Sequence, residues 1–442
     1  MHTLEQLRAG ELRGARHLKL SENLVEFPPE ILKLKETLEV LDLTGNQLST
    51  LPDELAGFSK LRIIFCSENR FTELPEVLGC CPALTMVGFK ANRIARVSAK
   101  SLPAGLRWLI LTDNAIESLP DELGQCDGLQ KLMLAGNRLR ELPETLANCR
   151  RLELLRIAAN RLEALPEWLL SLPRLTWLAY SGNPFSDALE SRMAASAQVA
   201  DIRWHELALG ESLGQGASGV IHGASWNQSE RQAVAVKLFK GAVTSDGLPR
   251  CEMTASLAAG NHPNLVEVVG RVADHPSGIP ALVMGLIDPA FANLAGPPSL
   301  ASCTRDIYAA DLRFTLPGMM ALARGIASVA RHLHGAGIMH GDLYGHNMLY
   351  ATGPCEEEVR VLLSDFGAAS FYERADQTRA FGLERLEVRA FGCLLEELLA
   401  RCEADEAKLA SLHRLKAACL AEQPQVRPDF AHICTVLDEV EL

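Results

Sequence analysis

Apolar and polar positions alternate with one long, fixed period through the first part of the chain. Most repeats follow the frame L-x-x-L-x-L-x-x-N-x-L, as in Leu38, Leu41, Leu43, Asn46 and Leu48. The aligned asparagines lie 23, 23, 23, 22, 23, 23 and 23 residues apart and are Asn23, Asn46, Asn69, Asn92, Asn114, Asn137, Asn160 and Asn183. Self-similarity at such a period indicates a solenoid. One repeat cannot close a core alone, so the pattern predicts eight stacked units that share their leucines.

This pattern resembles the leucine-rich-repeat family, over about residues 12–186. The resemblance implies one short strand per repeat on a concave face, with a segment on the convex side that begins at a Leu-Pro step such as Leu51-Pro52. It also implies that each asparagine side chain bonds backbone groups of the adjoining turn, since a buried polar ladder has to be satisfied.

The two strand positions between the leucines are expected to face outward on the concave side, and many of them are apolar. Contiguous exposed apolar surface marks interaction sites, and Trp and Met are common at protein interfaces. We therefore expect a protein partner, or the second half of this chain, to dock on Ile63, Phe65, Met86, Trp108, Met133 and Trp177. The alternative is that these side chains pack on one another and bind nothing.

The repeat pattern stops at about residue 186, and residues 188–200 are rich in Ala and Ser. This stretch predicts a helix that caps the open end of the solenoid. A chain of 442 residues exceeds the size at which a single core keeps growing, so two domains are expected. The predicted boundaries are 1–186 for the repeat domain, 187–202 for the junction and 203–442 for a second domain.

The second domain opens with an apolar, strand-like run that leads into a glycine-rich turn. Gly214, Gly216 and Gly219 form a G-x-G-x-x-G motif, in which backbone amides can close over phosphates. A dinucleotide-binding fold would continue with a helix. Instead the sequence continues with a β-branched strand, Ala233-Val234-Ala235-Val236-Lys237, which ends in lysine. The pattern therefore favours a phosphate-binding loop between two strands.

With this lysine strand the resemblance to the protein-kinase family becomes specific, and it covers about residues 203–442. The resemblance implies a bilobal kinase-like α+β domain behind the α/β solenoid, with ATP and Mg²⁺ as cofactors. Glu252, on a predicted helix, would pair with Lys237, while Met284 would be the gatekeeper. The residues that the resemblance assigns to nucleotide binding are Gly214, Gly216, Gly219, Ile221, Ala235, Lys237, Glu252, Met284 and Leu286.

Two further motifs follow in the order that kinases have them. His340-Gly341-Asp342-Leu343-Tyr344-Gly345-His346-Asn347 resembles the catalytic loop, behind a helix predicted over 320–334, and Asp365-Phe366-Gly367 resembles the D-F-G motif. By this resemblance Asp342 orients the attacking hydroxyl and accepts its proton, with Lys237 on the phosphates. Asn347 and Asp365 would hold Mg²⁺.

Several positions depart from the family. Gly341 stands where many kinases carry an Arg that pairs with a phosphorylated activation loop, so we expect activity without such phosphorylation. Tyr344 replaces a lysine near the γ-phosphate, which predicts slow turnover. The segment that binds the peptide is shortened, with no clear A-P-E. Glu387 resembles the Asp of D-x-W-x-x-G, and Arg427 is expected to pair with Glu384 or Glu387.

Composition narrows the choice of partner and compartment. There are 43 basic and 55 acidic residues, a net charge of −12, and no basic stripe, which argues against nucleic acid. The charged N-terminus lacks a signal-peptide core and no stretch reaches the ~18 apolar residues of a membrane span, so a cytoplasmic location is expected. The 12 scattered cysteines suit reduced, buried thiols.

The expected function is that of an ATP- and Mg²⁺-dependent protein kinase, serine/threonine-specific by family prior, whose repeats recruit a protein substrate or regulator. Two alternatives stay open. One is a pseudokinase scaffold, motivated by Gly341 and Tyr344. The other is a small-molecule kinase of the aminoglycoside-phosphotransferase type, in which H-G-D-x-x-x-x-N is also found. The glycine loop, the lysine strand and the repeats argue against this last class.

Overall fold

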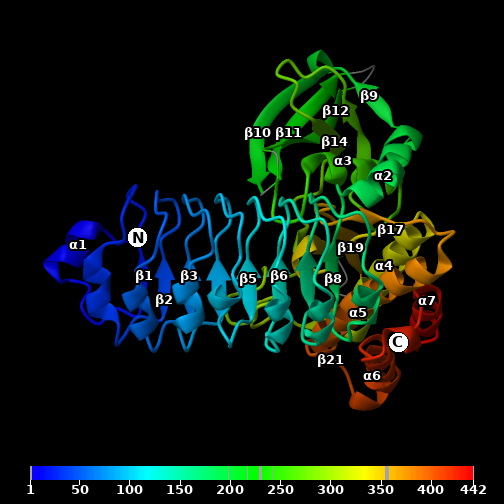
Figure 1. Cartoon of the computed structure of the whole chain (residues 1–442). Coiled ribbons are helices and arrows are strands. Elements are labelled where there is room, and N and C mark those ends of the chain that lie inside the picture. Colours follow the sequence, from blue (N-terminus) through cyan, green and yellow to red (C-terminus); the bar gives the residue numbers. More distant parts are fainter. Residues whose placement is uncertain are drawn as a thin grey trace. The chain divides into compact units, whose positions relative to one another are not determined.

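The computed structural model describes residues 2–197, 199–216, 218–227, 231–241, 243–353 and 358–441 (Figure 1). Its contacts divide the chain into two compact units. The first runs to Leu175 and includes Asn183–Phe185, while the second comprises Thr176–Gly182 and continues from Ser186. Residues 176–182, which complete the repeat pattern, therefore belong with the second unit. The predicted boundaries at 186 and 202 stay predictions.

The first unit is a leucine-rich-repeat solenoid, as predicted. It begins with the short helix α1 (Leu4–Ala9), whose first turn is closed by a reciprocal capping box between Thr3 and Gln6. Its strands pair in parallel in chain order and are β1 (His17–Lys19), β2 (Val40–Asp42), β3 (Ile63–Phe65), β4 (Met86–Gly88), β5 (Trp108–Ile110), β6 (Lys131–Met133) and β7 (Leu154–Arg156).

A 3-10 turn follows each of these strands. These turns are η1 (Pro29–Leu34), η2 (Asp53–Gly57), η3 (Glu76–Cys80), η4 (Ala99–Ser101), η5 (Asp121–Gln125), η6 (Glu144–Asn148) and η7 (Glu167–Ser171). A proline precedes most of them as the N-cap residue, as Pro120 does for η5. The fixed φ of proline favours this entry into a helical turn. The frame leucines of both sides, such as Leu132 and Leu146, are completely buried between strands and turns.

The asparagine ladder forms as the resemblance implied. Asn137 is typical: its Oδ1 accepts from Ile116 N at 3.0 Å, and its Nδ2 donates to Leu111 O at 2.8 Å and Leu134 O at 3.0 Å. The side chain thus satisfies backbone groups of its own repeat and of the preceding one. Asn160 repeats these bonds one period later. The ladder explains why the period tolerates little variation, because an insertion would leave buried amides unpaired.

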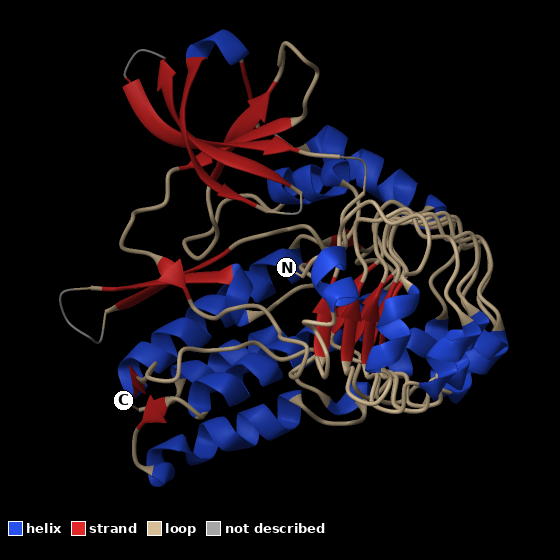
Figure 2. Ribbon diagram, turned by 90° about the vertical axis from the view of Figure 1, so that its left-hand side faces the viewer, coloured by secondary structure: helices blue, strands red, loops and turns tan. Residues whose placement is uncertain are grey.

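The second unit has a β-rich part and a helical part, which lie at the top and the bottom of the unit in Figures 1 and 2. The β-rich part is a six-stranded sheet in the order β10-β11-β12-β14-β13-β9. Its strands are β9 (Ala200–Ile202), β10 (Leu207–Gln215), β11 (Gly219–Asn227), β12 (Arg231–Phe239), β13 (Val268–Val272) and β14 (Ala281–Gly285). The turn η8 (Trp204–Glu206) precedes β10, and helix α3 (Pro249–Ala258) follows β12.

The helical part is built on four helices, α4 (Leu316–Gly335), α5 (Gln377–Leu399), α6 (Glu406–Cys419) and α7 (Phe430–Asp438). Short strands and turns connect them and are β15 (Ala292–Asn293), β16 (Phe314–Thr315), β17 (Ile338–Met339), η9 (Gly345–Asn347), β18 (Met348–Thr352), β19 (Val359–Leu363), β20 (Ser370–Phe371), β21 (Cys402–Glu403) and η10 (Pro424–Val426). Helix α4 buries an apolar stripe that includes Met320, Ile326 and Leu333. It confirms the helix predicted before the catalytic loop and begins four residues earlier.

The junction differs in part from its prediction. Helix α2 spans Pro184–Ser196 rather than 188–200, and Ala200–Ile202 forms β9, which pairs in parallel with β13. Strand β8 (Trp177–Ala179) precedes this helix along the chain. The predicted capping role of the helix stays a prediction. Within the described residues no helix is both long and apolar enough to cross a membrane.

Candidate active site

The lysine strand and helix α3 place Lys237 and Glu252 in direct contact. Lys237 Nζ forms an ion pair with Glu252 Oε1, and the two side chains are 13% and 3% exposed. Burial raises the pKa of Glu252, and the Lys237 ammonium acts against this rise. A carboxylate buried to this extent is stabilised only when it is paired. The ion pair that the kinase resemblance implied is therefore formed.

Sheet register groups the predicted nucleotide-binding side chains. Lys237 lies opposite Ile221 on β11, and Ala235 lies opposite Met284 on β14. Ala235 and Lys237 are two residues apart and share a face, because strand side chains alternate. Met284 is half-buried, while Leu286 lies just beyond the end of β14 and is 45% exposed. The register thus brings Ile221, Ala235 and Met284 to the face of the sheet that carries Lys237.

The glycine-rich turn connects β10 and β11. Gly216 N donates to Gly219 O at 2.9 Å, which closes the turn. A β-carbon at Gly219 would lie 2.5 Å from Leu238 O, so this position requires glycine. Gly214 and Gly216 have open space around them. Ala217, which follows Gly216 in the motif, lies outside the described residues.

Asp342 and Asn347 meet at the catalytic loop. Asn347 Nδ2 donates to the backbone oxygen of Asp342 at 2.9 Å and to its Oδ2 at 2.8 Å. The backbone N–H and the hydroxyl of Ser364 both donate to Asn347 O at 2.9 Å, which ties the loop to the residue before Asp365. The loop and the D-F-G motif are therefore held together at their bases.

The donor set at Asn347 and Asp365 suits a hard cation. The Nδ2 of Asn347 is engaged with Asp342, which leaves its amide oxygen as the available ligand atom. Asp365 is exposed, and its backbone has φ 58°. A carboxylate and an amide oxygen, completed by phosphate oxygens and water, match the ligands that Mg²⁺ takes in proteins. The residues present thus fit the metal that the kinase resemblance implied.

Glu387 of α5 is hydrogen-bonded to the catalytic loop. Its carboxylate accepts from Gly341 N at 2.8 Å, His340 N at 3.2 Å and His334 Nε2 at 2.8 Å. It therefore occupies the place expected from the D-x-W-x-x-G resemblance. Arg427 donates to the backbone oxygens of Ala421 and Arg385, at 2.9 Å each, and its expected pairing with Glu384 or Glu387 stays a prediction.

The structure explains why glycine stands at position 341. Its φ is +73°, and a β-carbon there would lie 2.6 Å from both Ala368 O and Leu178 O. An arginine at this position would therefore meet backbone on two sides. Leu178 belongs to β8, so the segment that excludes the side chain comes from the last repeat strand.

Trp177 is covered by this chain itself. Its side chain is 2% exposed and stacks on Tyr344 of the catalytic loop, with ring centroids 4.1 Å apart and 9° between the planes. Of the two occupants expected at this residue, a protein partner or the second half of this chain, the structure has the second, so Trp177 is not exposed to a separate partner. Tyr344 is itself 5% exposed.

The other predicted partner residues have mixed outcomes. Ile63 and Met86 are buried, at 5% and 3% exposed, so the expectation of exposure is wrong for them. Ile63 lies opposite Met86, and Met86 opposite Trp108, in parallel register. Neighbouring strands are only about 4.8 Å apart, so such side chains cover one another. Phe65, Trp108 and Met133 are half-buried.

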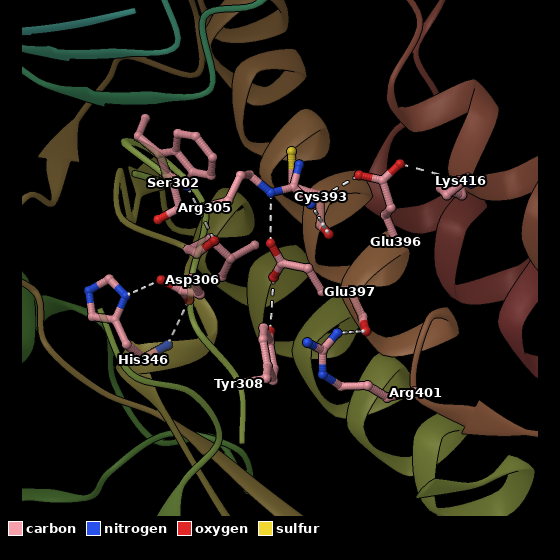
Figure 3. A network of polar contacts seen from close by, with 12 residues as sticks. Ser302, Arg305, Asp306, Tyr308, His346, Cys393, Glu396, Glu397, Arg401 and Lys416 are labelled. Atoms are coloured by element: carbon pink, nitrogen blue, oxygen red, sulfur yellow. Dashed lines mark hydrogen bonds and ion pairs between the residues drawn. The ribbon is translucent and has the colours of Figure 1, made fainter. Parts of the chain in front are cut away.

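A polar network beside the catalytic loop was not predicted (Figure 3). Asp306, in the segment before α4, accepts from His346 N at 2.9 Å and from His346 Nδ1 at 2.7 Å. Burial lowers the pKa of His346, but the Asp306 carboxylate more than offsets this and raises it overall. The only sequence signal is the run of charged and aromatic residues at 305–308, whose distant partners a sequence pattern does not specify.

The same network continues to α5. Arg305 Nε donates to Glu397 Oε1 at 2.7 Å, and Tyr308 Oη donates to Glu397 Oε2 at 2.9 Å, as Figure 3 shows. A β-carbon at Gly345 would lie 2.5 Å from Tyr308 Oη. Residues 305–308 thus pack directly on the catalytic loop, and the Glu397 carboxylate of α5 holds them in place.

The stretch between D-F-G and α5 is very short. Only the nine residues 368–376 separate Gly367 from Gln377, where α5 begins. Two of them form β20, which pairs with β17 in front of the catalytic loop. The shortened segment predicted from the sequence is therefore found, and it leaves little chain for a peptide-binding platform.

Comparison with known proteins agrees with both halves. Residues 207–391 match the family described as protein tyrosine and serine/threonine kinase, and leucine-rich-repeat models match residues 37–58, 104–162 and 127–185. A relative in Dictyostelium discoideum named probable serine/threonine-protein kinase gdt4 is 26% identical over 48% of this chain and 13% of its own length. Dual specificity protein kinase pyk3 of the same organism is 22% identical, over 54% of this chain and 19% of its own.

The repeats have relatives of their own. Leucine-rich repeat and IQ domain-containing protein 4 of Homo sapiens is 41% identical over 15% of this chain and 12% of its own length. The chain thus spans less than a third of each of these relatives. The family matches and the geometry of Lys237, Glu252, Asp342 and Asn347 lead to one conclusion. The chain joins leucine-rich repeats to a domain of the protein-kinase family.

Proposed function

We propose that this chain transfers the γ-phosphoryl group of ATP to serine or threonine hydroxyls of a protein. The observation that carries the proposal is the closed Lys237–Glu252 ion pair, formed in the same structure as the Asp342–Asn347 hydrogen bond. Kinases require this lysine-glutamate pair for activity. Apolar residues of similar size would be at least as stabilising as this buried pair, so its presence supports a catalytic role over a purely structural one.

Each residue has a task in this reaction. The ammonium of Lys237, held by Glu252, would bind the α- and β-phosphates, and the glycine turn would cover them. The carboxylate of Asp342, oriented by Asn347 Nδ2, would accept a hydrogen bond from the substrate hydroxyl and take its proton. Mg²⁺ bound by Asn347 and Asp365 would neutralise charge on the phosphate oxygens.

The choice of serine or threonine rests on the relatives, several of which are named serine/threonine-protein kinases. Substrate recruitment is proposed for the repeats, on Phe65, Trp108 and Met133. Their half-buried side chains support this, because part of each apolar surface stays accessible to a docking protein.

The test is transfer of labelled phosphate from ATP with Mg²⁺, to the chain itself and to generic protein substrates. Asp342→Ala should lower the rate by about 10²–10⁴-fold, the usual contribution of a positioned base. Lys237→Met should abolish transfer and also weaken the rise in melting temperature that ATP causes. Asp311→Ala, which removes an exposed carboxylate of the same unit, serves as the matched control. Equal rates in Asp342→Ala and wild type would refute the proposal.

A scaffold without phosphoryl transfer is the second candidate, and the nine-residue segment before α5 favours it. A protein substrate normally docks on that segment, and here it is too short to form a platform. The same assay separates the two functions. Thermal stabilisation by ATP without transfer to protein, sugars or aminoglycosides would support the scaffold, whereas transfer to a sugar or an aminoglycoside alone would indicate a small-molecule kinase.

A further inference from the structure

Strand β8, which completes the repeat pattern, contacts the catalytic loop through the ring and the indole nitrogen of Trp177. Trp177 stacks on Tyr344 in an almost parallel arrangement, and its Nε1 lies 3.4 Å from the backbone oxygen of Leu343. Leu343 directly follows Asp342, so this contact lies one residue from the group proposed to accept the proton. Stacked aromatic pairs stabilise beyond the area they bury.

The same strand also holds the segment that follows D-F-G. Tyr180 N donates to Ser370 Oγ at 3.1 Å, and Tyr180 Oη donates to Phe371 O at 2.9 Å. Ser370 and Phe371 form β20, which pairs with β17 immediately before the catalytic loop. Tyr180 is 2% exposed, so these bonds are shielded from water. Residues 177–180 therefore contact both the catalytic loop, which carries Asp342, and the segment that follows the D-F-G motif.

A third contact reaches the helix that carries Glu252. Glu190 of α2 accepts from Gly182 N at 2.8 Å, from Ser186 Oγ at 2.7 Å and from the Cys251 thiol at 3.3 Å. Glu190 is 8% exposed, and burial raises the pKa of Cys251 to about 12, so the thiol keeps its proton and donates. Cys251 directly precedes Glu252. The stretch 177–190 thus touches all three elements of the candidate site.

Gly341 is the residue that makes room for this arrangement. Most side chains at 341 would collide with Leu178 O, and the arginine of many kinases is absent there. In those kinases a phosphorylated activation loop orders the catalytic residues through such charged contacts. Here the activation segment has nine residues, and strand β8 lies where the arginine side chain would begin.

We propose that residues 177–190 replace the activation segment as the element that orders the catalytic loop, with Trp177 and Tyr180 as positioning residues. The proposal rests on the phosphoryl-transfer function above. It makes the last repeat strand part of the enzyme: the kinase domain on its own, without residues 177–190, has an incompletely ordered site. Misplacing a catalytic group by about 1 Å can lower a rate about 10²-fold.

The test is Trp177→Leu in the full chain, with Trp168→Leu as the matched control. Trp168 lies in the turn η7 of the preceding repeat segment and has no assigned role in the site. Two readouts are measured: kcat and KM for ATP, and deuterium uptake by the peptide that covers residues 341–347. We expect kcat to fall at least 10-fold, KM for ATP to stay within about 3-fold, and uptake at 341–347 to rise. Trp168→Leu should match wild type in both.

The conservative variants keep the proposal decidable if Trp177→Leu does not fold. Trp177→Phe retains a stacked ring but lacks the N–H, and Tyr180→Phe loses one hydrogen bond. Each should give a smaller fall in kcat and a smaller rise in exchange than Trp177→Leu. Wild-type kcat and wild-type exchange in Trp177→Leu, or in both Phe variants when Trp177→Leu is unfolded, would overturn the proposal.

The proposed function and the proposed positioning role can be refuted separately. A wild-type chain that transfers no phosphate refutes the proposed function, while the exchange of 341–347 still decides whether Trp177 orders the loop. A wild-type chain that is active, together with an unchanged Trp177→Leu, refutes the positioning role alone.

Discussion

The backbone N–H of Gly341 donates a hydrogen bond of 2.8 Å to Glu387 Oε1, and so joins the catalytic loop to helix α5. The other carboxylate oxygen accepts from His340 N and His334 Nε2, which gives Glu387 three donors from two elements. Its side chain is 2% exposed. A buried carboxylate with this many donors is a rigid support, since none of its partners can move without leaving a charge unsatisfied.

Removing the charge of Glu387 should destabilise the second unit in a pH-dependent way. Burial favours the neutral acid, but hydrogen bonds from His334 and the backbone lower the pKa of Glu387 below its ordinary value of 4.5. A lowered pKa contributes stability that is complete above the unfolded value and is lost as the pH falls through the folded value. Glu387→Gln should therefore cost about 1–3 kcal/mol at pH 7, because a donor is left unsatisfied.

Chemical denaturation between pH 3 and pH 7 measures this effect. The difference between wild type and Glu387→Gln should be constant above about pH 5 and should shrink below about pH 4.5. Glu439→Gln, at an exposed position, is the control and should show little difference at any pH. A Glu387→Gln difference that stays the same down to pH 3 would contradict the assignment.

Side chains at position 341 should be poorly tolerated. Gly341→Ala carries the cost of positive φ, about 1–2 kcal/mol, and adds an overlap with two backbone oxygens at 2.6 Å. Gly260→Ala isolates the first term, because Gly260 has φ +66° and open space around it. Thermal unfolding should show a larger loss for Gly341→Ala than for Gly260→Ala. Equal losses would mean that the backbone around Gly341 relaxes freely.

The parts of the fold that follow from the sequence are those whose signals are local. The asparagine at every 22 or 23 residues determines the ladder, because each Asn bonds its own repeat and the one before it. The kinase motifs likewise identify Lys237, Asp342 and Asn347 from the sequence, because each motif is one short, continuous segment.

Contacts between distant segments were not predictable from these patterns. Trp108 and Trp177 occupy the same place in the repeat frame, and only the fold shows that Trp177 is covered by Tyr344, 167 residues further along the chain. Asp306 and His346 are 40 residues apart, in segments with no periodic pattern. Periodicity reports which face of an element is buried, but not which other element buries it.

Loss of one ladder asparagine should destabilise the repeats strongly. Asn137→Ala leaves the Ile116 amide without its acceptor, and it removes one of two donors from each of the Leu111 and Leu134 carbonyls, which keep Asn114 and Asn160. The unsatisfied amide costs about 1–3 kcal/mol, and the two lost carbonyl bonds add to this loss. Asn148→Ala, at an exposed position of η6, should change the unfolding midpoint very little. Similar midpoints for both variants in urea would show that water replaces the ladder bonds.

Replacing Glu397 alone should destabilise the second unit, because Arg305 then loses its main ionic partner. Replacing both residues together should cost much less. The two oxygens of Glu397 take Arg305 Nε at 2.7 Å and Tyr308 Oη at 2.9 Å, and its side chain is 14% exposed against 33% for Arg305. Glu397→Met leaves the guanidinium half-buried beside one remaining carboxylate, that of Glu396. Removing one partner of a buried pair costs about 3–5 kcal/mol.

The double variant Arg305→Met and Glu397→Met decides between charge pairing and packing as the reason for this cost. A buried pair replaced by apolar residues of similar volume is often nearly neutral. We therefore expect the double variant to be more stable than Glu397→Met alone, with a coupling energy within the range of about 0.5–3 kcal/mol that contacting residues show. Urea unfolding of the four proteins in this cycle gives that energy directly. Additive losses would mean that Arg305 and Glu397 support the segment beside the catalytic loop independently, through Cys393 O and Tyr308.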